Sequence, residues 1–425
     1  MVVGRIFRLR VTPEQDAALH DWAGICRAVW NTGLEQRREY RRRDGWVNYP
    51  QQARELAQAK TDPDLAWLTQ APSHVLQQTL MDLDRACRAV GTWRVRWRSK
   101  DRWSPSMRFP DGPRMRVQRL SKRWGRVNLP KLGWVKFRWT RDLDGRVRSA
   151  TVNVRDGQWH VTFLVEDGIL EVQPPVSDPR PAVGVDRGVK IAAALSDGRM
   201  LDQTFITAAE QDRLVRLQQR LGRQHGPRSK PSKDRQRKNP KARGRRQQPS
   251  ARYLRTKKRI AAVQGKVRRR RDDWLTKTAR QLVREHSLVA IENLNTKGMT
   301  RSPAAKPDPD RPGAFLANQR SQKAGLNRAI LGKGWGRFAL TLAHQARYTG
   351  CRIVQVLAAF TSQRCHQCSH TEAGNRESQA DFRCTKCGWR GNADINAACN
   401  ILAAGLAVAG RASPTPVGSV NPQAA

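Results

Sequence analysis

Four cysteines near the end of the chain form two CxxC pairs, Cys365 with Cys368 and Cys384 with Cys387, separated by fifteen residues. This spacing is typical of zinc ribbons, because two thiolates on each of two tight turns reach a tetrahedral ion with Zn–S bonds of about 2.3 Å. The alternative is a pair of disulfides. The N-terminal segment lacks the apolar core of a signal peptide, which favours an intracellular chain with reduced thiols. We therefore predict one structural zinc ion.

The other four cysteines, Cys26, Cys87, Cys351 and Cys399, each stand alone in apolar surroundings. Free cysteine is among the most buried residue types, so we expect these four in the core. Cys399 is close in sequence to the CxxC pairs, which leaves a role beside them open.

The charge of the chain is strongly one-sided. Its 425 residues include 80 Lys and Arg against 36 Asp and Glu, a formal net charge of +44. A chain of this charge repels itself unless a polyanion neutralises it, so we expect nucleic acid as the partner. Membrane attachment is the weaker explanation, because the sequence shows no lipidation motif and no run of eighteen apolar residues. The predicted location is the bacterial cytosol and nucleoid.

The first hundred residues predict a strand followed by helices. Residues 2–11 alternate loosely, and Thr12-Pro-Glu-Gln15 has the form of a capping box with proline at the first helical position. Apolar residues then recur at helical spacing, and a second such stripe begins at Ser73. We expect these stripes to be core, within a small helical domain over residues 12–104.

Between residues 105 and 178 the apolar period changes to two. Asp156-Gly157 separates two alternating runs, which is the strongest short-range signal for a β-hairpin, and Asp144-Gly145 marks another turn. We predict a β-barrel or strongly curved sheet that also takes in the N-terminal strand.

From about residue 180 the pattern becomes α/β. Residues 182–186 and 288–292 are short buried strands that each end in an acid, and residues 352–357 predict a third. Further expected elements are a hairpin with its turn at Asp197-Gly198, a helix over 335–348 and a last helix from near Asn392.

The most basic stretch of the chain, residues 220–271, contains 22 Lys and Arg and one acid. We predict that it binds phosphates, with Arg268, Arg269, Arg270 and Arg271 as contacts, since each neutralised phosphate releases counterions. A solvated surface is the alternative. A helix is expected over 251–282, and residues 301–325 are expected to form a loop or lid.

Three acids stand out in this basic protein, namely Asp186, Glu292 and Asp394. Two end buried strands and the third begins the last helix. An isolated acid after a strand is usually a loop residue, but a cluster of three repels itself without cations. Such a cluster can hold two Mg²⁺ or Mn²⁺ ions for phosphodiester hydrolysis.

Several motifs resemble the TnpB (OrfB) family of insertion-sequence-encoded, RNA-guided nucleases, which are related to type V CRISPR effectors. They are Gly-Val-Asp186-Arg-Gly-Val-Lys, Ile-Glu292-Asn-Leu-Asn, Thr361-Ser-Gln-Arg-Cys365 and Asn392-Ala-Asp394-Ile-Asn. One departure is Ser369, where the family usually has glycine after the first CxxC, which predicts strain in that turn.

The resemblance implies a multidomain α/β fold with a β-barrel. Its parts are a WED-like β-barrel over 1–11 and 105–178, an inserted helical recognition domain over 12–104, an RNase H-like (RuvC) nuclease over 179–364 and 391–410, a zinc ribbon over 365–390 that binds target nucleic acid, and a disordered tail over 411–425. By position, Asp186, Glu292 and Asp394 become the catalytic and Mg²⁺- or Mn²⁺-binding residues.

The implied activity is a metal-dependent DNA endonuclease that cleaves beside a short target-adjacent motif. Its implied partners are a guide RNA from the transposon end, double-stranded target DNA and a transposase encoded nearby. A miniature type V CRISPR effector and a nuclease-inactive, RNA-guided DNA-binding repressor are the alternatives. Retention of all three acids disfavours the repressor.

Overall fold

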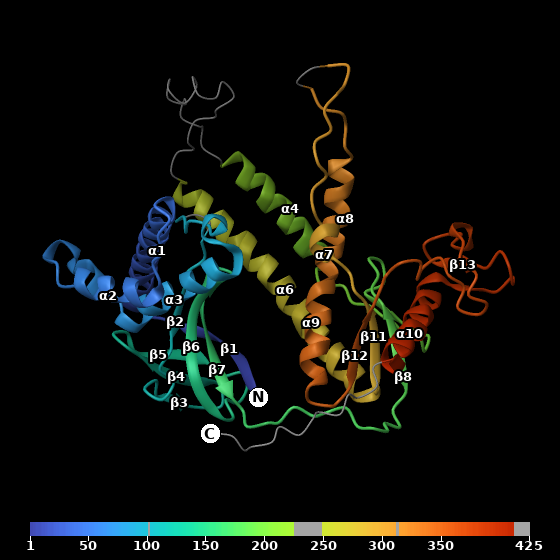
Figure 1. Cartoon of the computed structure of the whole chain (residues 1–425), viewed down its shortest axis with the longest axis horizontal. Helices are drawn as coiled ribbons and strands as arrows, with labels where there is room; N and C mark the ends of the chain where they lie inside the picture. Colours follow the sequence, from blue (N-terminus) through green and yellow to red (C-terminus); the bar gives the residue numbers. More distant parts are fainter. Residues whose placement is uncertain (101–102, 225–248, 312–313, 412–425) are drawn as a thin grey trace. The chain divides into compact units, whose positions relative to one another are not determined.

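The computed structural model describes residues 1–100, 103–224, 249–311 and 314–411. The chain divides into two compact units (Figure 1). The first comprises Met1–Ile169 and Leu217–Gly265, and the second comprises Leu170–Arg216 and Lys266–Ala425.

The first unit contains a helical part. Its elements are α1 (Pro13–Arg42), α2 (Tyr49–Ala59), the 3-10 helix Pro63–Gln70, α3 (Ser73–Val90) and the 3-10 helix Thr92–Arg94. The predicted capping box is confirmed, since Thr12 accepts from the backbone N–H of Gln15 and the side chain of Gln15 accepts from the N–H of Thr12. The stripes of α1 and α3 are buried, as predicted, and Cys26 and Cys87 lie within them.

A seven-stranded antiparallel sheet forms a second part of this unit. Its strands are β1 (Val2–Arg10), β2 (Ser106–Phe109), β3 (Val117–Arg119), β4 (Trp124–Leu129), β5 (Gly133–Arg138), β6 (Arg146–Arg155) and β7 (Gln158–Glu166). Their order is β2-β6-β7-β1-β5-β4-β3, so the N-terminal strand joins the sheet as predicted. The hydrogen-bonded order ends at β2 and β3. The phenyl rings of Phe7, Phe137 and Phe163 meet in its core.

The second unit contains a five-stranded sheet. Its strands are β8 (Ala182–Asp186), β9 (Ala193–Leu195), β10 (Met200–Leu201), β11 (Leu288–Glu292) and β12 (Arg352–Val356), in the order β10-β9-β8-β11-β12. β8, β11 and β12 are parallel, whereas β9 and β10 complete an antiparallel hairpin. These are the strands that the apolar runs predict.

Helices cover both faces of this sheet. The α-helices that the structure describes after β10 are α4 (Ala208–Arg223), α6 (Ala251–Glu285), α7 (Thr296–Met299), α8 (Arg320–Lys333), α9 (Trp335–Ala346) and α10 (Ala393–Arg411). Apolar residues of α6 and α9 pack with Val183, Val185, Val289 and Ile291 on one face. On the other face α10 lies so close to β8 that a Cβ on Gly184 would stand 2.1 Å from the carbonyl oxygen of Ala398.

α10 also has the length and hydropathy of a membrane span over Ala393–Gly410. Within the described part of the chain it is the one helix that does. Its residues Ile401 and Ala404 pack against Leu288 and Ala290 of the sheet, which is the packing of a core helix.

One expectation needs correction, and another can be assessed only in part. The predicted loop over 301–325 is too long, because α8 begins at Arg320. Gln319 precedes this helix at φ +54° and provides no side-chain cap, so the sequence carries no start signal there. Of the basic stretch 220–271, residues 225–248 lie outside the described residues, whereas the predicted helix over 251–282 is confirmed by α6.

Candidate active site and metal centre

The alternation of side chains along the strands brings the three acids to one place. Ala182 and Gly184 of β8 face α10, as do Leu288 and Ala290 of β11, so Asp186 and Glu292 continue the rows on that face. Val185 pairs with Ile291, which sets the two acids at the same level. Asp394 lies in the first turn of α10, four residues before Ala398, whose carbonyl oxygen lies against Gly184 of β8.

The three acids influence one another electrostatically. Burial and, after it, the charges of Glu292 and Asp394 together raise the pKa of Asp186 to about 7, while Arg376 opposes the rise. A carboxyl that is both desolvated and beside two like charges favours its neutral form. A divalent cation would reverse that preference.

Glu292 is buried and held at two points. Thr361 Oγ1 donates to Glu292 Oε1 at 2.6 Å, and Thr361 is also buried. The guanidinium of Arg187 donates to the backbone carbonyl of Glu292 and, at 3.1 Å, to that of Trp335. Burial lowers the pKa of Arg187, while the two neighbouring acids counteract this. Arg187 thus fixes the end of β11 from the residue after Asp186.

Asp394 is held by the start of its own helix and by a cation. The side chain of Asn392 accepts from the backbone N–H groups of Asp394 and Ile395, which caps α10. Arg376 Nη2 donates to Asp394 Oδ1 at 3.0 Å.

These residues fit a divalent-cation site. Carboxylate oxygens are the ligands that Mg²⁺ and Mn²⁺ prefer, and burial beside two further acids raises the pKa of Asp186, which a bound cation would lower again. Among the described residues, the one group of three or more metal-binding side chains with all ligand atoms within 4.8 Å is a different one, the four cysteines.

The four predicted zinc ligands converge. Sγ atoms of Cys365 and Cys387 are 3.8 Å apart, and those of Cys368 and Cys384 are 3.5 Å apart. A tetrahedral ion with Zn–S bonds of about 2.3 Å separates its sulfurs by about 3.8 Å, so the cluster fits zinc. The backbone N–H groups of Cys387 and Lys386 lower the pKa of Cys384 to about 6, whereas burial and the neighbouring sulfurs raise the pKa of Cys387 to about 12. A zinc ion would favour the thiolate form of both.

One buried amide side chain holds the two turns around this cluster together, and one residue of the first turn has a left-handed backbone conformation. Asn375 donates to the carbonyls of Gln363 and His370 and accepts from the N–H of Thr385, so it ties the two turns together. Strands β13 (Asp381–Arg383) and β14 (Arg390–Asn392) pair beside it. Ser369 lies at φ +61°, in the left-handed region predicted to strain a non-glycine residue.

Two asparagines of α10 connect the ribbon to the acids. Asn396 accepts from the N–H of His366 at 3.0 Å and donates to the carbonyl of Arg364 at 2.8 Å. Asn400 donates to the same carbonyl and to that of Thr361 at 3.0 Å. The helix that carries Asp394 therefore also holds the segment that supplies Thr361.

The sequence did not identify Arg187, Thr361 or Arg376 as site residues. The first two lie inside the quoted motifs, beside Asp186 and before Cys365, which was a usable signal. No sequence signal pointed to Arg376, because its ion pair with Asp394 depends on the fold of the ribbon. The doubt about Cys399 is also resolved, since its Sγ donates to the carbonyl of Ser196 and lies outside the four-cysteine group.

The predicted phosphate contacts on α6 have roles within the protein as well. Arg270 donates to Glu210 and to the carbonyl of Phe205, and Arg271 donates to the carbonyl of Leu331 at 2.8 Å. The contact of Arg268, Arg269, Arg270 and Arg271 with nucleic acid stays a prediction.

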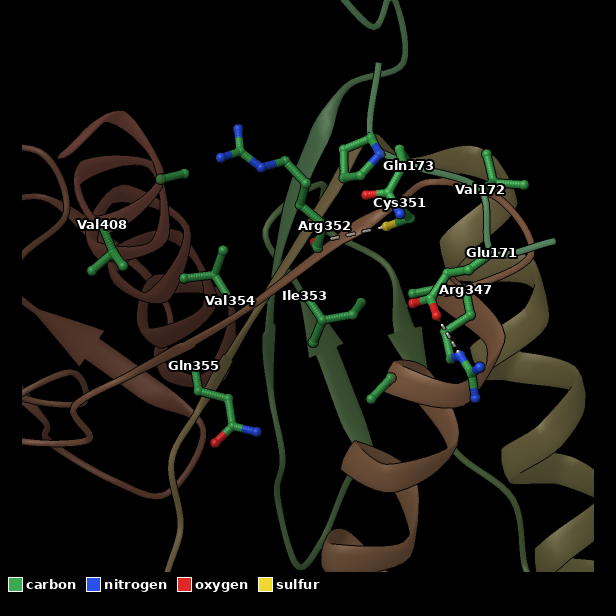
Figure 2. Close-up of a pocket in the computed structure, with 14 residues that line it drawn as sticks. Glu171, Val172, Gln173, Arg347, Cys351, Arg352, Ile353, Val354, Gln355 and Val408 are labelled. Atoms are coloured by element: carbon green, nitrogen blue, oxygen red, sulfur yellow. Dashed lines mark hydrogen bonds and ion pairs between the residues drawn. The ribbon is translucent and has the colours of Figure 1, made fainter. Parts of the chain in front are cut away.

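A cavity of about 530 Å³ lies along the outer edge of β12 (Figure 2). Glu171 and Arg347 form an ion pair of 3.1 Å on its wall, and Cys351, Ile353 and Val354 line it. None of the three acids lines this cavity.

Parts of the chain match known protein families. Residues 160–303 match the family described as "Probable transposase" (OrfB_IS605), and residues 335–401 match "Cas12f1-like, TNB domain". Residues 4–45 match a "Helix-turn-helix domain", although this segment contains β1 and the single continuous helix α1.

Two curated relatives align along almost the whole chain. "Putative RNA-guided DNA endonuclease InsQ" from Escherichia coli (strain K12) is 34% identical over 405 residues, covering 95% of this chain and 92% of the relative. "Putative RNA-guided DNA endonuclease" from Streptomyces pristinaespiralis is 28% identical, with 95% and 90% covered.

Solved structures are more distant. The Cas12f1–sgRNA–target DNA complex aligns with 94% of this chain and 98% of that chain at 11% identity and a TM-score of 0.44. The mini-RNA-guided endonuclease CRISPR-Cas_phi3 aligns with 67% of this chain and 57% of that chain, with 13% identity and a TM-score of 0.34.

Proposed function

Since this chain belongs to the TnpB (OrfB) family, we propose that it is an insertion-sequence-encoded, RNA-guided DNA endonuclease that cleaves beside a short target-adjacent motif. The observation that carries the proposal is the meeting of Asp186, Glu292 and Asp394, from two strand ends and one helix start, with Asp186 at a pKa of about 7. The alignment with InsQ over 95% of the chain supports it.

In this proposal the three carboxylates would hold two Mg²⁺ or Mn²⁺ ions, which would supply activation of water and stabilisation of the departing oxygen of a phosphodiester. The residues of the chain prepare that site. Thr361 orients the carboxylate of Glu292, Arg187 fixes its backbone, and Arg376 supplies positive charge beside Asp394. Asp186 must release its proton to act as a ligand.

The proposed zinc site is structural. Four thiolates leave no open coordination position for water, which distinguishes a structural site from a catalytic one. Its role here is to fold the ribbon, which presents Arg376 to Asp394.

We assign the domains on the same basis. The five-stranded sheet with α6, α9 and α10 is the RNase H-like (RuvC) nuclease, and the seven-stranded sheet, whose hydrogen-bonded order ends at β2 and β3, corresponds to the WED-like barrel of the family. The part containing α1, α2 and α3 is its helical recognition domain. Base pairing with the guide RNA selects the target, while the protein reads a short flanking duplex motif.

A miniature type V CRISPR effector is less well supported. Cas12f1 of Sulfoacidibacillus thermotolerans is 42% identical, but over 60 residues that cover 14% of this chain. The alignment with InsQ spans nearly the whole chain.

The test combines two changes, namely exchange of the guide segment of the RNA and removal of one of the three acids. The full chain is purified with the RNA that copurifies, and exchange of the guide segment is expected to move cleavage to the matching DNA. Asp186→Asn is expected to lower the cleavage rate about a thousandfold or more, because metal-assisted charge stabilisation is worth several kcal/mol. Binding of RNA and target is expected to persist.

Asp212→Asn is the matched control, since it removes one exposed carboxylate of α4 and leaves the site intact. Cleavage that follows a fixed DNA sequence whatever the guide would refute RNA guidance. Cleavage that persists in Asp186→Asn would refute the assignment of the acids.

A further inference from the structure

One face of the seven-stranded sheet gathers cations from three strands. Along β1, β4 and β5 the buried residues, such as Leu9, Val127 and Phe137, alternate with outward-facing ones. We call the outward set the β1–β5–β4 face. It consists of Arg8, Arg10, Trp124, Arg126, Lys136 and Arg138.

Strand register places three of these cations directly opposite one another. Arg10 of β1 pairs with Lys136 of β5, and Lys136 pairs with Arg126 of β4. Like charges opposite each other across strands destabilise a sheet. This row therefore lowers the stability of the isolated protein unless an anion lies on it.

Carboxylates do not neutralise the row. In the part of the chain that the structure describes, none of the five cations of this face forms an ion pair with an acid. Asp142, which follows β5, pairs with Arg119 at 3.2 Å instead. Arg126 donates to the neutral amide of Gln118 at 2.8 Å.

Aromatic rings lie among the cations. The guanidinium of Arg138 stands 5.2 Å from the ring of Trp124, and that of Arg126 stands 4.2 Å from the ring of Trp134. An indole ring flanked by cations offers a surface for a flat, electron-rich group.

Two cavities open beside Trp124, with volumes of about 490 and 310 Å³. Both are lined by Arg10 and Trp124. Lys136, Leu120 and Ser121 line the larger one, whereas Arg8, Leu9 and Arg138 line the smaller one. Volumes of this size are in the range of ligand sites.

We infer that the β1–β5–β4 face binds an unpaired nucleotide of the guide RNA, with its base against Trp124 and the adjoining phosphates on Arg10, Lys136 and Arg126. A cationic groove with an aromatic platform is the usual composition of sites for single-stranded nucleic acid. A base enters such a cavity only when it is unstacked, which excludes a regular duplex.

Guide RNA fits the β1–β5–β4 face better than target DNA does. The repulsion within the cation row persists for as long as the face is empty, so a permanently bound polyanion offsets it better than a transient one. The inference rests on the proposed function, which supplies an RNA that stays with the protein.

The test measures binding of the full chain to an in vitro transcript of the RNA that copurifies with it. Trp124→Ala is expected to weaken binding about five- to 150-fold, the measured range for loss of one base stack, whereas Trp124→Phe keeps an aromatic platform and most of the affinity. Arg10→Gln with Lys136→Gln is expected to lower the slope of log affinity against log salt by about 1.4.

Arg119→Gln is the matched control, because it removes a cation already paired with Asp142 and is expected to leave RNA binding unchanged. Thermal unfolding of each variant detects a change in folding, and the double glutamine variant tests the face without altering Trp124. Wild-type RNA affinity in both Trp124→Ala and the double variant overturns the inference.

Two further outcomes would refute either the inference or the proposed function on which it rests. Normal RNA binding with weakened binding of target DNA in Trp124→Ala would assign the face to DNA and refute the inference. A wild-type chain that binds no guide RNA refutes the proposed function itself, which separates that failure from a failure of this site.

Discussion

The hydroxyl of Thr361 donates a 2.6 Å hydrogen bond to Glu292, although 69 residues separate the two in the chain. Both side chains are buried, so water does not replace this bond if it is lost. Loss of a group that orients a metal ligand typically weakens metal affinity about 10- to 100-fold.

Thr361→Val is therefore expected to raise the Mg²⁺ concentration for half-maximal cleavage by about 10- to 100-fold. Thr361→Ser restores the hydroxyl and is expected to restore the Mg²⁺ dependence. Thr341→Val is the control, since that hydroxyl donates within α9 to the carbonyl of Arg337. An unchanged Mg²⁺ dependence in Thr361→Val would show that Glu292 needs no positioning.

Asp186 makes the stability of the Mg²⁺-free protein depend on pH. Its pKa of about 7 lies above the value of about 3.9 in an unfolded chain, so between these values the folded state binds the extra proton. Stability is thus expected to fall as pH rises from about 4 to 7. Urea unfolding of wild type and Asp186→Asn at pH 5 and pH 8 measures this.

The asparagine variant is expected to lose less stability between the two pH values, and added Mg²⁺ is expected to restore wild type at pH 8. Identical pH dependence in the two proteins would contradict the raised pKa of Asp186 and thus its burial beside the other two acids.

Ser369 offers a stabilising substitution. Because a left-handed backbone costs a residue with a Cβ about 1–2 kcal/mol, Ser369→Gly is expected to raise the free energy of unfolding by about 1 kcal/mol. Gly388, at φ +72° after the second CxxC pair, is the reciprocal control, and Gly388→Ala is expected to destabilise. Denaturant midpoints compare them, and a destabilised Ser369→Gly would contradict the strain.

The ribbon is expected to bind one zinc per chain, measured by elemental analysis. Cys384→Ala is expected to lose the zinc and most cleavage, because the unfolded ribbon no longer holds Arg376 beside Asp394. Cys399→Ala, outside the cluster, is expected to retain both. Full zinc content and activity in Cys384→Ala would refute the site.

The sequence predicted what depends on local pattern. Asp186 and Glu292 were found because each ends a short buried strand, and the cysteines were found by their spacing. Thr361 and Arg376 were not, since their partners come from other elements. The pairing of Arg10 with Lys136 depends on register between strands more than a hundred residues apart, which no local pattern specifies.

The start of α8 shows the same limit at a smaller scale. Gln319 adopts a positive φ without a capping side chain, so only the folded chain reveals where that helix begins.

Asn396 connects the two ends of the ribbon. It hydrogen-bonds to Arg364 and His366, where the ribbon begins, and it lies four residues after Asn392, where the ribbon ends. An insertion whose ends are fixed together can be lengthened, shortened or exchanged during evolution without displacing the helix that follows. Exchange of the ribbon between relatives is therefore expected to leave α10 in place, provided that the new ribbon also supplies an arginine to Asp394.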